Sequence, residues 1–87
     1  MRPLNYAILK LFEDGAEVDV QGVISTLKKE YSSFRAFKLK AVNESLMSAE
    51  KNGMLEESKW ELDNKGELHV YYKATDYGFD MIKGYIR

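Results

Sequence analysis

The sequence predicts an α+β fold, and three patterns carry this prediction. Apolar residues recur at helical spacing through the first half of the 87-residue chain. Two strand-like segments follow, at about residues 55–63 and 67–74, and the second alternates apolar with polar side chains. The Asp63–Gly66 segment between them has the composition of a hairpin turn. We therefore expect helices first, then a β-hairpin, then a last helix.

Two helices are expected in the first part of the chain. The first covers about residues 3–13, and Gly15 suits the left-handed position that often follows a helix. A short strand is expected at 16–18. Asp19 can cap a second helix over about residues 20–31, because its carboxylate can accept hydrogen bonds from the unpaired amides of the first turn.

A third helix is expected over about residues 38–52. Extending it backward would bury Arg35 and Lys38 and expose Phe37, which is unfavourable. Residues 32–37 are therefore expected to form a turn or a separate helical turn, so that the second and third helices make a helix-turn-helix. The inward face of the third helix is formed by three apolar residues at helical spacing: Val42, Leu46 and Ala49.

The second half of the chain completes the fold. Trp60 and Leu62 share one face of the first strand, and we expect Trp60 at the core or its edge. Thr75 can cap a last helix over about residues 76–86. The expected order is helix, short strand, helix, helix, hairpin, helix. This order is that of a winged helix-turn-helix, and we expect one domain over residues 1–87.

Three motifs resemble winged-helix regulators. The segment LMSAEKNGMLE at 46–56 resembles the end of the recognition helix in the PadR and MarR families. The segment YKATDYG at 72–78 resembles their passage from the second wing strand into the following helix. Ala49 and Ala74 replace leucines that are usual there. The segment NYAILK at 5–10 is similar to the first helix of small YjcQ-type winged-helix proteins of Gram-positive bacteria and their phages.

The resemblance implies a DNA-binding transcriptional regulator that uses the third helix as its recognition helix. Lys40 could donate to guanine and Asn43 could pair with adenine. Arg35 and Lys38, ahead of the helix, suit phosphates, and Lys65 lies at the tip of the wing. The predicted DNA-binding residues are Arg35, Lys38, Lys40, Asn43, Glu44, Met47 and Lys65.

The charge distribution leaves a second function open. The chain has 13 basic and 14 acidic side chains and a net charge of −1, so it has no overall basic surplus for DNA. Residues 28–43 are basic, but Lys65 is surrounded by carboxylates, and Glu44 lies in the middle of the expected recognition face. The alternative function is therefore a winged-helix protein–protein interaction module that does not bind DNA. The acidic residues of the hairpin are Glu56, Glu57, Glu61, Asp63 and Glu67.

The last helix carries two apolar rows. One row can cover the domain, and the second points elsewhere, where it would be exposed or meet a partner. Tyrosine and methionine are enriched at protein interfaces. We expect the chain to form a homodimer through the second row, which consists of Tyr77, Met81 and Tyr85.

Other function classes lack their characteristic residues. Cysteine is absent and His69 is the only histidine, so we expect no metal site, and we read His69 as a surface residue beside Tyr71. No glycine-rich phosphate loop and no nucleophile set is present, so we expect neither an enzyme nor a cofactor. No small-molecule ligand is indicated. No apolar run approaches the ~20 residues of a membrane span, and a cytoplasmic location is expected.

Overall fold

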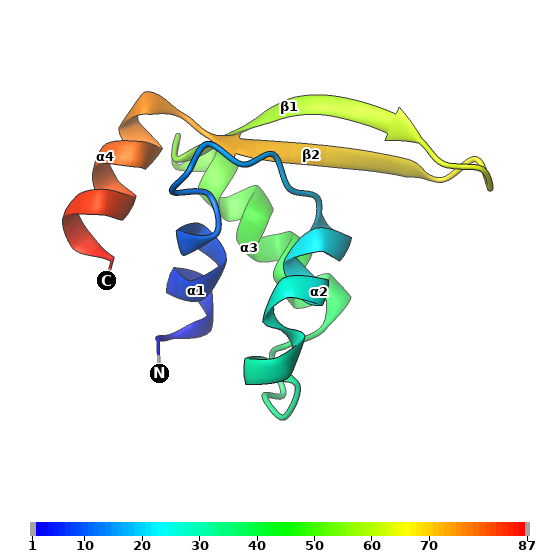
Figure 1. The fold of residues 1–87 in the computed structure, drawn as a ribbon, viewed down its shortest axis with the longest axis horizontal. Coiled ribbons are helices and arrows are strands. Elements are labelled where there is room, and N and C mark those ends of the chain that lie inside the picture. The colour runs from blue at the N-terminus through cyan, green and yellow to red at the C-terminus, as the bar shows by residue number, and fades with distance from the viewer. Residues whose placement is uncertain (1, 87) are drawn as a thin grey trace.

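The computed structural model describes residues 2–86 and has the expected α+β architecture (Figure 1). The first three helices pack together, and a long hairpin lies along one side of them (Figure 1). The turn of the hairpin projects past α2, and the last helix returns to the side of α1 (Figure 1). The elements are α1 (Leu4–Lys10), α2 (Val20–Tyr31), α3 (Leu39–Lys51), β1 (Leu55–Leu62), β2 (Leu68–Ala74) and α4 (Asp76–Tyr85).

The core lies where the helices meet the inner ends of the two strands. The predicted inward face of α3 is confirmed, because Val42, Leu46 and Ala49 are all buried. None of the helices within residues 2–86 has the length and apolar character needed to cross a membrane. The largest fully buried side chains are Tyr31, Phe12, Ile8, Leu46, Leu55, Ile82, Val23 and Val42.

The first helix is shorter than predicted. It ends at Lys10, and the chain continues in tight turns, with Phe12 N–H donating to the Leu9 carbonyl at 3.0 Å. These turns direct Phe12 into the core, where it is fully buried. The strand expected at 16–18 is reduced to a single bridge, in which Val18 pairs with Tyr72.

The helix-turn-helix follows the prediction closely. The Asp19 carboxylate caps α2 by accepting from Gly22 N–H at 2.8 Å. In the turn that follows α2, the Phe34 ring packs edge-on against the Tyr31 ring, with the ring centroids 4.9 Å apart. Phe37 also packs beside Tyr31. The third helix then begins at Leu39, as the charge pattern predicts.

The strands pair antiparallel, from Leu55 opposite Ala74 to Leu62 opposite Leu68. The register shifts between Glu57 and Lys59, so Ser58 is an extra residue in β1.

The turn that joins the strands is built around Asp63. Gly66 donates to the Asp63 carbonyl at 3.0 Å and has φ +79°, a conformation that favours glycine. The Asp63 carboxylate accepts from the backbone N–H groups of Lys65 and Glu67 at 2.8 and 2.9 Å. These bonds close the turn predicted from the sequence.

The expectation for Trp60 is wrong. Its side chain is 64% exposed, and that of Leu62 is 72% exposed. The reason is the length of the hairpin, whose outer part extends beyond the helices that would cover it (Figure 1).

The last helix is attached at both of its ends. Thr75 caps it by accepting from Gly78 N–H at 2.9 Å, and the same hydroxyl donates to the Gly53 carbonyl at 2.6 Å. Gly78 lies against the backbone of Met54, where a Cβ would overlap the Met54 carbonyl. At the other end, the Lys10 ammonium donates to the Ile86 carbonyl at 3.0 Å.

Candidate nucleic-acid interface

The exposed face of α3 holds four of the predicted DNA-binding residues: Lys40, Asn43, Glu44 and Met47. They divide between two sides of the helix. Lys40, Asn43 and Met47 border a hollow between α3 and the hairpin. Glu44 borders a different hollow, between α3 and α1. The Asn43 amide donates to the Met47 sulfur at 3.6 Å, one helical turn away. The side nearer the hairpin therefore carries the base-reading candidates, and Glu44 stands apart from them.

The basic approach to α3 consists of Arg35, Lys38 and Lys40. All three are exposed, and within residues 2–86 none of them makes an ion pair. The turn that carries Arg35 is fixed in place, because Phe34 and Phe37 pack on Tyr31 on either side of it. The three cations are thus exposed and unpaired at the N-terminal end of α3.

Lys65 lies in the hairpin turn, at the far end of the hairpin (Figure 1). Its side chain is exposed, and its backbone N–H donates to Asp63. Glu61 and Glu67 are exposed nearby in sequence. A phosphate contact by Lys65 would therefore be made in an acidic neighbourhood.

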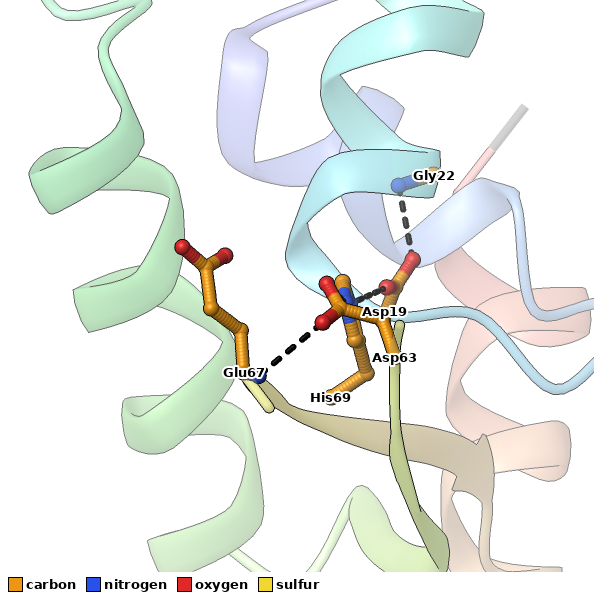
Figure 2. Close-up of polar contacts among 5 residues, drawn as sticks. All are labelled: Asp19, Gly22, Asp63, Glu67 and His69. Carbon is orange, nitrogen blue, oxygen red and sulfur yellow. Dashed lines mark hydrogen bonds and ion pairs between the residues drawn. The ribbon is translucent and has the colours of Figure 1, made fainter. Parts of the chain in front are cut away.

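Sequence reasoning missed a polar bridge centred on His69. The imidazole Nδ1 lies 3.0 Å from Asp19 Oδ2, and Nε2 lies 2.9 Å from Asp63 Oδ2 (Figure 2). His69 is thus not a simple surface histidine, since two carboxylates hold its ring. The bridge connects the turn of the hairpin to the start of α2. Only Asp63 could have been placed from the hairpin register, because Asp19 is brought to His69 by the tertiary fold.

The electrostatics of the bridge favour a charged imidazole. The pKa of His69 is raised, first by its hydrogen bond to Asp63 and then by that to Asp19. The pKa of Asp63 is lowered, chiefly by the hydrogen bond from His69 and by the N–H of Glu67. A neutral imidazole can donate through one nitrogen, whereas the imidazolium donates through both. Protonated His69 therefore holds the hairpin more firmly than neutral His69.

The row on α4 is turned away from the core at its two ends. Tyr77 and Tyr85 are exposed, and Met81 is partly buried. The opposite side of the helix packs inward through Ile82 and Ile86, which are buried. Within residues 2–86, no group of three histidine or acidic side chains is arranged to hold a metal ion.

The architecture matches known structures over nearly the whole chain. The crystal structure of Bacillus subtilis PadR in complex with operator DNA superposes with a TM-score of 0.79 and 24% sequence identity. The match covers 99% of this chain and 48% of that one. The fold is a PadR-like winged helix.

A second match supports the PadR-like fold. A PadR-like transcriptional regulator from Bacillus cereus superposes with a TM-score of 0.69 and 21% identity, over 92% of this chain and 74% of that one. The chain spans about half the length of the Bacillus subtilis protein. No protein-family model and no curated protein sequence matches it.

The PadR-like fold gives the sequence motifs a physical basis. The 46–56 motif covers the end of α3 and the start of β1, and the 72–78 motif covers the end of β2 and the start of α4. In the second motif, Thr75 caps α4 and bonds to Gly53, and Gly78 permits close packing on Met54. The hairpin is the wing of this fold.

Proposed function

We propose that this chain is a transcriptional regulator that binds duplex DNA through α3. The main support is its likeness to a PadR structure that contains operator DNA. The exposed, unpaired cations at the N-terminal end of α3 add to this support, because a recognition helix meets base edges with its N-terminal residues.

Five of the seven candidate residues have a role in this proposal. Asn43 pairs with adenine and Lys40 donates to guanine in the major groove. Arg35 and Lys38 contact phosphates beside the helix, and Lys65 reaches a phosphate from the wing.

A salt titration tests DNA binding. Fluorescence anisotropy of a labelled random-sequence duplex gives the binding constant at several salt concentrations. Three phosphate contacts give a slope of log K against log salt of about −3. We expect the double reversal Lys38→Glu with Lys40→Glu to abolish most of the binding.

The matched control is Lys59→Glu with Lys73→Glu. These two lysines share the hairpin face that holds Tyr71, by the register of the strands. The control should keep affinity close to that of the unmodified protein. Equal losses in both double variants would show diffuse attraction and would reject α3 as the recognition element.

A protein-interaction module is the second candidate function. The observation that favours it is the chemistry of the wing, which is acidic and exposes Trp60 and Leu62. Neither property suits contact with phosphates, since carboxylates repel them and apolar side chains gain nothing from them.

We also propose that the chain forms a homodimer through α4. The exposure of Tyr77 and Tyr85 on either side of Met81 supports this proposal. A symmetric pair would present two recognition helices to a palindromic site.

A further inference from the structure

A hollow of about 580 Å³ separates α3 from the hairpin. Its apolar lining comes from both elements, with Leu39 and Met47 on α3 and Leu68 and Val70 on β2. Leu39, Met47 and Leu68 are exposed large apolar side chains. The hollow therefore presents a surface that water covers in the isolated chain.

The extra residue at Ser58 extends this apolar surface along the hairpin. Side chains of directly opposed residues lie on the same face of a sheet. Trp60 is opposite Val70, and Leu62 is opposite Leu68, so both share the face that borders the hollow. Without the extra residue, the alternation along β1 would place Trp60 and Leu62 on the other face.

Carboxylates border the same surface. Glu50 on α3, Glu57 on β1 and Glu67 directly before β2 line the hollow, and Lys40 is the only lysine in the lining among residues 2–86. His69 also lines the hollow, but its imidazole is already paired with Asp19 and Asp63. Two of these carboxylates also act on a buried side chain, because the pKa of Tyr72 is raised first by burial and then by the charges of Glu50 and Glu57. Glu57 also accepts a hydrogen bond from the Trp60 indole at 2.9 Å. We call the hollow, together with the hairpin face that holds Trp60 and Leu62, the groove. Its floor is apolar and its border is negatively charged.

We propose that the groove between α3 and the hairpin binds a basic amphipathic helix of a partner protein. Apolar side chains of that helix cover Met47, Trp60 and Leu62, and its lysines or arginines meet the carboxylates. The proposal does not rest on DNA binding, although the partner would cover Lys40 and Asn43 and so compete with DNA.

The backbone of the groove favours a helical partner. The surface is formed by a helix side and a sheet face, which present side chains to a partner. The unpaired backbone groups of a two-stranded hairpin lie along its edges and not on this face. An extended peptide lying on the face would therefore leave its own backbone groups without partners, whereas a helix satisfies its own. The eight residues of β1 span about 26 Å, the length of a helix of about 17 residues.

Other occupants fit less well. DNA and anionic membranes carry the same sign of charge as the carboxylates at the border. A small molecule would fill the hollow but leave Trp60 and Leu62 uncovered, because they lie outside its lining. A second copy could offer its α4, but Asp76 and Asp80 outnumber Lys83 on that helix, so its charge has the wrong sign.

Trp60 gives a direct test, because it is the only tryptophan in the chain. The probe is a synthetic helical peptide of about 17 residues with leucines at helical spacing, lysines on both flanks and no aromatic residues. We expect a saturable blue shift of Trp60 emission when the peptide is added. A peptide with glutamates in place of the lysines should leave the emission unchanged.

Two groove variants and one control sharpen the test. Glu57→Lys with Glu67→Lys should weaken peptide binding at least about tenfold, because it places like charges together. Leu62→Asp should weaken peptide binding similarly. The fold of the domain should be unaffected, because the Leu62 side chain is 72% exposed. The control, Asp14→Lys with Asp80→Lys, changes the net charge by the same amount outside the groove. Its peptide affinity should stay within about twofold of that of the unmodified protein.

Several results would overturn the proposal. These are an absent blue shift, equal binding of the glutamate peptide, or equal affinities of the groove and control variants. A duplex DNA that shifts Trp60 emission equally in the protein and in Glu57→Lys with Glu67→Lys would assign the groove to DNA. A dimer that Leu62→Asp converts to a monomer would assign it to a second copy. None of these results depends on the Lys38→Glu with Lys40→Glu experiment, so the two proposals fail separately.

Discussion

The Nδ1 atom of His69 lies 3.0 Å from Oδ2 of Asp19, a residue 50 positions earlier in the chain. Asp19 is 8% exposed and uses its other oxygen to cap α2. One carboxylate therefore fixes both the start of a helix and the position of the wing. The opposite nitrogen of the same imidazole contacts Asp63, so the charge state of His69 governs both contacts.

Wing attachment should depend on pH. The pKa of His69 is raised, so its contribution to holding the wing is complete below the ordinary value of about 6.5. That contribution is lost as the pH rises through the higher pKa of the folded protein. The pKa of Asp63 is lowered, so its contribution to holding the wing is present above about 3.9. That contribution is lost as the pH falls through the lower pKa of the folded protein. The wing should be held best between these limits.

Nuclear magnetic resonance can follow His69 alone, since it is the only histidine. We expect a pKa above about 6.5, which Asp63→Asn should move back toward that value and Asp76→Asn should leave unchanged. A wild-type pKa at or below 6.5 would mean that the bridge is absent in solution.

Two glycines of α4 should respond oppositely to alanine. Gly78→Ala should lower the free energy of unfolding by about 1–3 kcal/mol, because its Cβ would overlap the Met54 carbonyl. Gly84→Ala should raise it by up to about 0.5–1 kcal/mol, because no atom lies near the added Cβ. Chemical denaturation measures both. Similar changes of the same sign would show that α4 does not pack on Met54.

Leu46 should be the main apolar anchor of α3. It is fully buried, so Leu46→Ala should cost about 2–5 kcal/mol of unfolding free energy. Leu39→Ala, in the same helix at a half-exposed position, should change it by no more than about 0.5 kcal/mol. A loss below about 1 kcal/mol at Leu46 in chemical denaturation would refute the face assignment.

Self-association should respond to changes in the outward row of α4. Sedimentation equilibrium at tens of micromolar should give a dimer mass for the unmodified chain. Met81→Glu should give a monomer, and so should Tyr85→Glu, whose site is 76% exposed and does not contribute to the core. A monomer mass for the unmodified chain removes the dimer, and a dimer that survives both changes has its interface elsewhere.

Local signals explain which features of the fold were predictable. The cap at Asp19, the turn at Asp63 and the start of α3 each depend on residues within a few positions of one another. The inward face of α3 follows from helical periodicity alone. These features are therefore present in the sequence pattern, and the structure confirms them.

Features that depend on distant packing were missed. The exposure of Trp60 reflects how far the hairpin reaches past the helices, which no local pattern records. Ser58 carries no sign in the sequence that it is an extra residue. The contact of His69 with Asp19 requires α2 and β2 to be positioned together. Four of the seven candidate DNA-binding residues were placeable on α3, but their division between two sides of the helix was not.

The hydroxyl of Thr75 connects the start of α4 to the turn that follows the end of α3. It accepts from Gly78 at the start of α4 and donates to Gly53, directly after α3. Because Gly78 also lies tightly against Met54, the first turn of α4 cannot shift without moving that backbone. A partner bound to α4 would therefore act on the same short stretch of backbone, Gly53 and Met54, that joins the recognition helix to the wing.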